Sequence, residues 1–276
     1  MTESSILRVA LSQFFVQETS EENSRLIDER IARAAGEGAG LLILPEGVLA
    51  RRPGCGSWGA EHAERIDGPF VTRLLESTAK PGRENLLVVC TALLKKNPGD
   101  PAEKRAANML LAVRNGRLEL AYQKLHLYDA FKAKESDNVV PGNEVPKLLK
   151  AGPFTVGFLT CYDLRFPELA RRLAVDGAEL LAAPSAWVKG PLKEMHWDLC
   201  IRGRALENTC YVAGVSECGP VNIGESKIAD PLGFVCAQCG PSDEMRFADL
   251  DRERVLEARR SLPVLENRRF RTPELR

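Results

Sequence analysis

The sequence lacks a net charge, a long apolar run and more than a few histidines. Its 38 basic and 38 acidic residues cancel, so no overall field favours nucleic acid, an anionic membrane or a polyanionic ligand as a partner. No segment approaches the length of a membrane span. The three histidines, His62, His126 and His196, form no H-x-x-x-H or H-x-H pair. We therefore expect neither a nucleic acid nor a membrane as a partner, and no catalytic metal.

The N-terminal segment does not have the composition that is typical of a secretory leader. Its first five residues carry no positive charge, and Arg8, Ser12 and Gln13 interrupt the first apolar stretch, so we expect no signal peptide. Eight cysteines in a chain without such a leader are typical of a reducing compartment, in which they remain thiols. We therefore expect a cytoplasmic protein.

Strand-like and helix-like segments alternate along the chain. An apolar run at 6–14, a helical pattern over 19–38 and a second apolar run at 39–47 predict a β-α-β unit, with Thr19 or Ser20 as the helix cap. Two extended runs flank Asn115-Gly116, which predicts a β-hairpin. Further strands are predicted at 84–96, 151–161, 178–187, 209–218, 227–238 and 244–250, further helices at 68–80, 167–177, 191–208 and 251–262, and an extended tail at 263–276.

This order of elements predicts an α/β protein. Because hairpins are mixed with the alternating strands and helices, we expect mixed rather than purely parallel sheets. The sequence has no internal repeat, low-complexity tract or Gly/Ser-rich linker. We therefore expect residues 1–276 to form a single domain.

Four of the predicted strands end at residues that are capable of chemistry. Ligand sites in α/β proteins gather at the carboxyl ends of strands, and these ends carry Glu46, Lys124, Cys161 and Trp187. Each residue alone has a structural explanation. Cys161 could be a small buried hydrophobic residue, and Lys124 could be a solvated residue at the end of a strand. Glu46 could be a helix cap or part of a structural ion pair. Taken together, they predict one site that contains a thiol, a carboxylate, an ammonium and an indole.

These groups are suited to nucleophilic catalysis. A thiol with a pKa of about 8.5 needs a base or a nearby positive charge to react at neutral pH. Glu46, with a pKa that we expect burial to raise, is the candidate base. Lys124 and the backbone N–H of Tyr162 are candidates to stabilise an oxyanion. The pattern indicates hydrolysis of an amide through a thioester, and a nitrile remains an alternative substrate.

Three ordered segments resemble the signatures of a known family. "LPEG" with Glu46, "YQKLHLYDAF" with Lys124 and "LTCYDLRFPELA" with Cys161 are similar to those of the nitrilase (carbon-nitrogen hydrolase) superfamily, and the likeness covers nearly the whole chain. The segments "KLHLYDAF", "SAWVKGPLKE" and "RALENTCYV" resemble its branch of deaminated glutathione amidases. Three motifs in order make the resemblance specific.

The resemblance implies roles, a fold and an assembly. It implies Cys161 as the nucleophile, Glu46 as the general base, Lys124 as the transition-state stabiliser, and Glu135 as a second glutamate that orients the lysine and the substrate. It also implies a four-layer α-β-β-α sandwich without a cofactor, and a homodimer formed through the helices near the cysteine, with the C-terminal tail reaching across.

The implied reaction converts a small carboxylate-bearing amide into an acid and an amine or ammonia. Deaminated glutathione or a related ω-amide is the expected substrate. A nitrilase, another carbon-nitrogen hydrolase such as a carbamoyl hydrolase or an ω-amidase, and a non-enzymatic binding module are the alternatives.

Residues that flank the catalytic segments are candidates for the pocket wall. We expect aromatic walls from Tyr128, Phe131, Tyr162 and Trp187, although each is equally typical of core packing. The candidate cations for a substrate carboxylate are Lys132, Lys134, Arg165 and Lys189. The loops at 51–64 and 96–105 resemble variable surface insertions.

Two rival sites can be formulated from the same sequence. If His126 lies on one strand with Lys124, the two side chains point to the same face, and His126 becomes an alternative base for the thiol. We interpret His126 as a supporting or packing residue. The pair Cys236 and Cys239 has C-x-x-C spacing but no second pair, so we interpret it as accidental rather than as a zinc or redox site.

Overall fold

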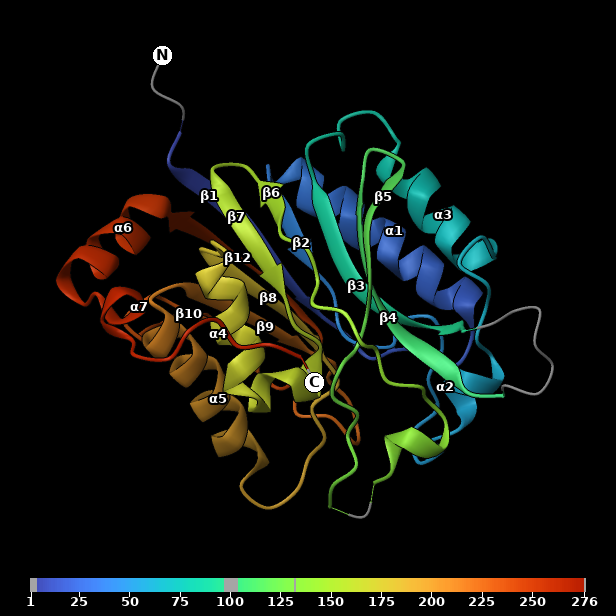
Figure 1. Cartoon of the computed structure of the whole chain (residues 1–276). Helices are drawn as coiled ribbons and strands as arrows, with labels where there is room; N and C mark the ends of the chain where they lie inside the picture. The colour runs from blue at the N-terminus through green and yellow to red at the C-terminus, as the bar shows by residue number, and fades with distance from the viewer. Residues whose placement is uncertain (1–3, 97–103, 132, 276) are drawn as a thin grey trace.

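The computed structural model describes residues 4–96, 104–131 and 133–275, and within them two six-stranded sheets pack face to face. The strand order is β12-β1-β2-β3-β4-β5 in the first sheet and β11-β10-β9-β8-β7-β6 in the second. Helices cover the outer face of each sheet (Figure 1). The expected α-β-β-α sandwich is confirmed.

The strands of the first sheet are β1 (Ile6–Gln13), β2 (Leu41–Ile43), β3 (Leu87–Lys95), β4 (Ala106–Arg114), β5 (Arg117–Gln123) and β12 (Glu244–Asp251). Those of the second are β6 (Leu149–Ala151), β7 (Phe154–Phe158), β8 (Leu180–Ser185), β9 (Tyr211–Ser216), β10 (Lys227–Ala229) and β11 (Val235–Gln238). The helices are α1 (Ser20–Gly36), α2 (Trp58–Glu61), α3 (Pro69–Thr78), α4 (Pro167–Val175), α5 (Lys193–Asn208), α6 (Arg252–Ser261) and α7 (Val264–Asn267). Two 3₁₀ turns, η1 (Glu135–Asp137) and η2 (Cys161–Arg165), complete the described elements.

Both sheets are mixed, as expected. In the first, β1, β2 and β3 are parallel, while β4, β5 and β12 pair antiparallel with their neighbours. Asn115 and Gly116 make the β4–β5 turn with φ values of +48° and +70°, which a type I′ turn requires and which asparagine and glycine adopt most readily. The predicted hairpin is therefore confirmed, and so is its cause, the positive φ values of Asn115 and Gly116.

Three apolar layers hold the sandwich together. One lies between the two sheets and includes Leu11, Phe154 and Phe158. A second lies between the first sheet and helices α1 and α3, and a third between the second sheet and helices α4 and α5. Strands β2 and β8 bury side chains on both faces, so the sequence around each is a nearly continuous apolar run, at 39–44 and 178–183.

Two expectations differ from the structure. The tail at 263–276 is not wholly extended, because the carbonyl of Pro263 accepts the N–H groups of Glu266 and Asn267 and closes the short helix α7. Strand β5 ends at Gln123, so Lys124 and His126 follow the strand instead of sharing it. Among the described helices, none is both long and apolar enough to cross a lipid bilayer.

Candidate active site

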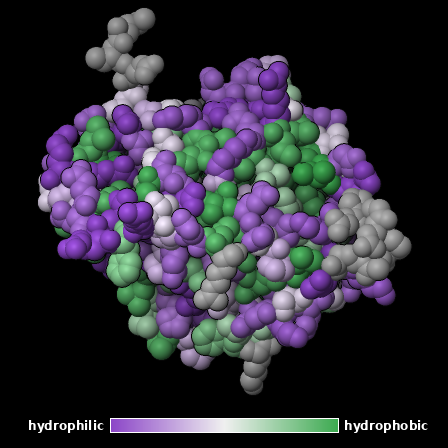
Figure 2. All heavy atoms as spheres, in the orientation of Figure 1, coloured by the Kyte–Doolittle hydropathy of each residue, from purple (hydrophilic) through white to green (hydrophobic). Residues whose placement is uncertain are grey.

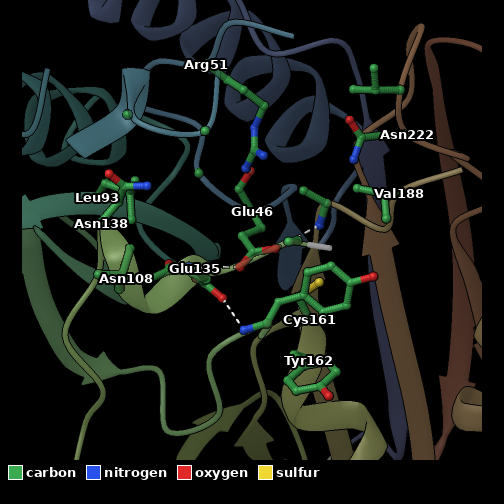
Figure 3. Close-up of a pocket in the computed structure, with 18 of the residues that line it drawn as sticks. Glu46, Arg51, Leu93, Asn108, Glu135, Asn138, Cys161, Tyr162, Val188 and Asn222 are labelled. Atoms are coloured by element: carbon green, nitrogen blue, oxygen red, sulfur yellow. Dashed lines mark hydrogen bonds between the residues drawn. The ribbon is translucent and has the colours of Figure 1, made fainter. Parts of the chain in front are cut away.

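A cavity of about 620 Å³ opens where strands of both sheets end (Figure 3). Glu46 follows β2, Lys124 follows β5, and Cys161 and Trp187 follow β7 and β8. All four line the cavity, as does Glu135 from η1. The expectation that these strand ends meet is therefore met by the geometry.

Cys161 begins a tight turn between strand β7 and helix α4. Its backbone has φ +45°, a conformation that a non-glycine residue adopts only when its surroundings impose it. The constraint comes from Asp163, which is fully buried and accepts the backbone N–H of Thr160 at 2.9 Å. Pro167 then starts α4 at a position where no N–H is needed. The turn holds the Cys161 side chain at the cavity with 9% of the residue exposed.

Asp163 also ties the segment after β5 to this turn. Its carboxylate accepts the backbone N–H of His126 at 3.1 Å and the hydroxyl of Tyr122 at 3.1 Å, and it lies 2.7 Å from His126 Nδ1. The His126 ring stacks on Phe166 with centroids 3.7 Å apart. His126 thus supports the cysteine turn and is not among the described residues that line the cavity.

Lys124 lies between two glutamates. Its Nζ donates to Glu46 Oε1 at 2.9 Å and to Glu135 Oε2 at 2.9 Å. The Asn108 amide donates to Glu46 Oε1 at 2.8 Å, and the Ala186 N–H donates to Glu46 Oε2 at 3.0 Å. Figure 3 shows Glu46, Asn108 and Glu135 close together in the cavity. Each carboxylate oxygen of Glu46 therefore has a donor that fixes its position.

The charges in this cluster set the protonation of Glu46. Burial alone raises the pKa of a carboxylate, but the neighbouring Lys124 and Arg51 outweigh burial and lower the pKa of Glu46. The expectation of a raised pKa is therefore wrong, because it considered burial without these two cations. The same attraction, from Glu135 and Glu46, outweighs burial at Lys124 and raises its pKa. Glu46 is ionised and Lys124 is protonated at neutral pH.

Unlike Glu46 and Lys124, the Cys161 thiol is held in its uncharged form. Burial and the adjacent Glu46 carboxylate raise its pKa, and the attraction of Lys124 offsets only part of this effect. At neutral pH the sulfur consequently keeps its proton while an ionised carboxylate lies beside it. A protonated nucleophile next to an ionised base is the arrangement that general-base activation needs.

The predicted aromatic residues separate into two groups. Tyr128, Tyr162 and Trp187 line the cavity, and the rings of Tyr128 and Tyr162 meet edge to face with centroids 5.1 Å apart. Phe131 is 66% exposed with φ +52°, and it is not among the described lining residues. It lies beside Lys193, whose Nζ is 3.7 Å from the ring centroid.

The residues predicted to bind a substrate carboxylate differ in whether they line the cavity. Arg165 lines the cavity with its guanidinium 4.5 Å from the ring centroid of Trp187. Lys134 lines it too, but pairs with Asp137 at 2.8 Å. Lys189 donates to the Gly219 carbonyl and is not among the described lining residues. Lys132 lies outside the residues that the structure describes.

Three charged residues of the cavity wall, Arg51, Arg52 and Lys193, were not predicted from the sequence. Arg51 belongs to the loop at 51–64 that resembled a surface insertion, yet Arg51, Arg52 and Cys55 line the cavity. The Arg51 guanidinium donates to the Glu46 carbonyl at 2.9 Å, and its Nε lies 3.0 Å from Glu217 Oε2. Glu217 is fully buried just after β9, and a carboxylate directly after an apolar strand was the available signal.

Two asparagines were missed as well. Asn108 lies within strand β4 and Asn222 follows Val221 on the opposite wall; both are buried and line the cavity. Neither Asn108 Oδ1 nor Asn222 Nδ2 has a hydrogen-bond partner among the described residues. A buried asparagine in an apolar run costs free energy unless it is paired, which is the signal that sequence offered.

The chain is similar to known proteins over nearly its whole length. Residues 8–260 match the family model described as carbon-nitrogen hydrolase. The chain is 42% identical over 267 residues to the deaminated glutathione amidase of Escherichia coli O157:H7, covering 97% of this chain and 99% of that one. It is 30% identical to the human deaminated glutathione amidase, covering 95% and 82% of the two chains. The crystal structure of Saccharomyces cerevisiae Nit3, a member of branch 10 of the nitrilase superfamily, superposes with a TM-score of 0.81 at 26% identity and covers 97% and 98% of the two chains.

The chain therefore belongs to the carbon-nitrogen hydrolase family. It is an amidohydrolase, an enzyme that hydrolyses the carbon-nitrogen bond of an amide.

Proposed function

We propose that this enzyme hydrolyses a small carboxylate-bearing amide through a thioester on Cys161. The observation that carries the proposal is the ion cluster of Glu46, Lys124 and Glu135 at the same end of the cavity as the protonated Cys161 thiol. The same reaction applied to a nitrile is the second candidate, and the experiment below separates the two.

Glu46 acts as the general base in the first step. It takes the proton of Cys161 while the sulfur attacks the carbonyl carbon of the amide. The negative charge that develops on the carbonyl oxygen is stabilised by the Lys124 ammonium and the Tyr162 N–H. The proton then passes from Glu46 to the nitrogen of the leaving group, the carbon-nitrogen bond breaks, and an amine or ammonia departs from a thioester.

The second step consumes water. Glu46 takes a proton from a water molecule while the oxygen attacks the thioester carbon. The carbon-sulfur bond then breaks, the acid is released, and Glu46 returns the proton to the sulfur to restore the thiol. Glu135 positions Lys124 in both steps, because it binds the ammonium with two oxygens at 3.1 and 2.9 Å. No cofactor enters this sequence.

The names of the relatives suggest the substrate. Proteins named deaminated glutathione amidase are 42% and 30% identical to this chain, so we assign it deaminated glutathione or a related ω-amide. The cavity volume of about 620 Å³ is in the range of small-molecule sites. Arg165, which has no ion pair within the described part of the chain, is the candidate cation among those selected from sequence.

A homodimer through helix α5 completes the proposal. Met195, Leu199 and Leu206 are 47%, 59% and 45% exposed along this helix. The β10–β11 turn lies against it through a 2.9 Å hydrogen bond from Arg202 to Gly233, and adds the exposed Phe234. Figure 2 shows hydrophobic side chains at the lower left, where α5 lies in Figure 1. We call these residues the α5 patch, and an apolar patch of this kind favours a protein partner.

Two further features belong to the same proposal. We infer that residues 1–276 fold as one domain, because apolar layers join the two sheets and their helices continuously. We also infer a cytoplasmic location, which is supported by eight free cysteines within the chain.

Intact-protein mass spectrometry tests the chemistry. Wild type and Cys161→Ala are incubated briefly with a panel of ω-amides that includes deaminated glutathione, together with matched nitriles, and released ammonia or amine is assayed in parallel. Amine release that Cys161→Ala abolishes supports the thioester amidase. Equal release by the variant contradicts the nucleophile, and turnover of the nitriles alone supports the second candidate.

A further inference from the structure

Lys193 is a buried cation in the wall of the cavity. The residue is 4% exposed and lines the cavity with Tyr128, Arg165 and Trp187. Its Nζ donates to the Tyr128 hydroxyl at 2.6 Å and lies 5.1 Å from the centroid of that ring. The Tyr128 ring in turn meets Tyr162, the residue next to the nucleophile. Lys193 therefore belongs to the same cavity as the thiol but to none of the roles described above.

The backbone holds Lys193 in this place. Its N–H donates to the Gly190 carbonyl at 3.2 Å, and its carbonyl accepts the indole N–H of Trp187 at 2.9 Å. Leu192, the residue before it, has φ +61°, which costs free energy in a leucine. These contacts anchor the first residue of α5, so the ammonium is positioned by the fold.

Within the described part of the chain, no carboxylate pairs with this ammonium. Four other cations that line the cavity have acidic partners: Lys124, Lys134, Arg51 and Arg52. Among the described residues, Lys193 forms no ion pair, and Arg165 beside it adds a second positive charge. Burial and Arg165 together lower the pKa of Lys193. A lysine in the first turn of a helix is also opposed by the helix dipole.

The burial of Lys193 without an ion pair, the nearby Arg165 and the helix dipole all destabilise the ammonium, so it needs an offsetting interaction. The faces of Tyr128 and Phe131 supply part of it through cation–π contacts, but an aromatic face does not neutralise a charge. A buried charge without an opposite partner often marks a functional position in a protein. An anionic group that enters the cavity and reaches Lys193 would neutralise this charge.

We propose that Lys193 binds the carboxylate of the substrate and selects anionic amides over neutral ones. The inference rests on the proposed amidase function and adds the residue that sets its specificity. The ligand class that it defines is a short-chain amide with a carboxylate at the end remote from the scissile bond, and the ammonium contributes an ion pair that a neutral amide lacks.

The test compares glutaramate with pentanamide, which have the same carbon chain and differ in whether a carboxylate or a methyl group ends it. kcat and KM are measured for wild type, Lys193→Met and Lys193→Arg. Lys193→Gln is a second neutral variant that can still donate a hydrogen bond to Tyr128. Lys189→Met is the matched control, because Lys189 is an exposed lysine close in sequence that donates to the Gly219 carbonyl and is not among the described residues that line the cavity. Circular dichroism and thermal melting identify variants that fail to fold.

We expect Lys193→Met and Lys193→Gln to lower the ratio of kcat/KM for glutaramate over pentanamide by about 30-fold or more, mainly through the KM of glutaramate. The rate with pentanamide should change little, Lys193→Arg should restore part of the ratio, and Lys189→Met should leave the ratio unchanged. A folded, active neutral variant with the wild-type ratio overturns the inference and leaves the amidase intact. A wild type that releases ammonia from neither amide, nor from the ω-amide panel, overturns the proposed function and this inference with it.

Discussion

The Nζ atom of Lys124 lies 2.9 Å from Oε1 of Glu46, although the two residues follow β5 and β2, strands that have β3 and β4 between them in the first sheet. Both are nearly inaccessible to water. Because the ammonium lies so close, the carboxylate stays ionised in a place where burial alone would protonate it. The ion pair thereby keeps the base in its reactive form.

Removing the lysine should be costly for the fold. Lys124→Met leaves Glu46 and Glu135 close together without their shared cation, and we expect a loss of about 3–5 kcal/mol in the free energy of unfolding. Urea denaturation measures the loss. The double variant Lys124→Met/Glu135→Gln should recover part of it, because one buried charge is gone. Strictly additive losses in the double variant would contradict this account.

Replacing the base should separate thiol ionisation from turnover. Glu46→Gln should lower kcat/KM by about 10²–10⁴-fold. The Glu46 charge raises the pKa of Cys161, so its removal should lower that pKa, and the thiolate should appear at a lower pH than in wild type. Ultraviolet absorbance of the thiolate and the pH dependence of alkylation measure this shift. An unchanged or higher pKa in the variant would show that Glu46 does not act on the sulfur.

His126 provides a test of the rival base. His126→Ala should reduce kcat/KM by less than about tenfold and still form the acyl-enzyme, because its ring contacts Asp163 and Phe166 outside the cavity wall. Loss of the hydrogen bond and the stacking should lower the free energy of unfolding by about 1–2 kcal/mol. Mass spectrometry detects the acyl-enzyme. Its disappearance in a folded variant would favour His126 as the base.

The charge of Lys193 should appear in the pH dependence of specificity. Its pKa is lowered from the ordinary value of 10.5, so the ammonium loses its proton at a lower pH than a solvated lysine would. The ratio of kcat/KM for glutaramate over pentanamide should then be constant near neutrality and fall as the pH rises toward 10. In Lys193→Arg, the guanidinium stays charged and the ratio should remain flat over the same range. If the ratio falls equally in wild type and in Lys193→Arg, a group other than Lys193 causes the pH dependence.

The α5 patch predicts the oligomeric state. Leu199→Asp places a charge at the centre of the patch and should convert a dimer into monomers, as measured by size-exclusion chromatography with light scattering. Ile66→Asp is the control, since Ile66 is 44% exposed in a loop apart from the patch. Wild type that elutes as a monomer, or a dimer that Leu199→Asp leaves intact, would contradict an interface through α5.

Much of the fold could be predicted because the buried strands and the turns leave strong local signals. Residues 39–44 are apolar on both faces, and Asn115-Gly116 supplies the two left-handed residues that a type I′ turn requires. The catalytic candidates were accessible for a related reason. Glu46, Lys124 and Cys161 each end an apolar run, and the carboxyl ends of strands in an α/β sheet gather at one edge.

The features of the site that could not be predicted from the sequence depend mostly on contacts between segments that are distant in the sequence. The pKa of Glu46 could not be derived without Arg51, which comes from a loop that looked like a surface insertion. Lys193 resembles an ordinary solvated lysine in sequence, because its burial follows from the left-handed Leu192 and the Trp187 indole. Phe131 lies outside the wall for a similarly local reason, its positive φ, which its residue type does not favour.

The pairing of β1 with β12 has a consequence for biosynthesis. Ile6 pairs with Asp251 and Gln13 with Glu244, so one edge of β1 stays unpaired until β12 has been translated. Throughout translation of the intervening chain, β1 presents unpaired N–H and C=O groups that another nascent chain could pair with. Chaperone demand during expression should therefore depend on how soon β12 emerges, and a circular permutant that encodes β12 directly before β1 should give a larger soluble yield at high expression rates.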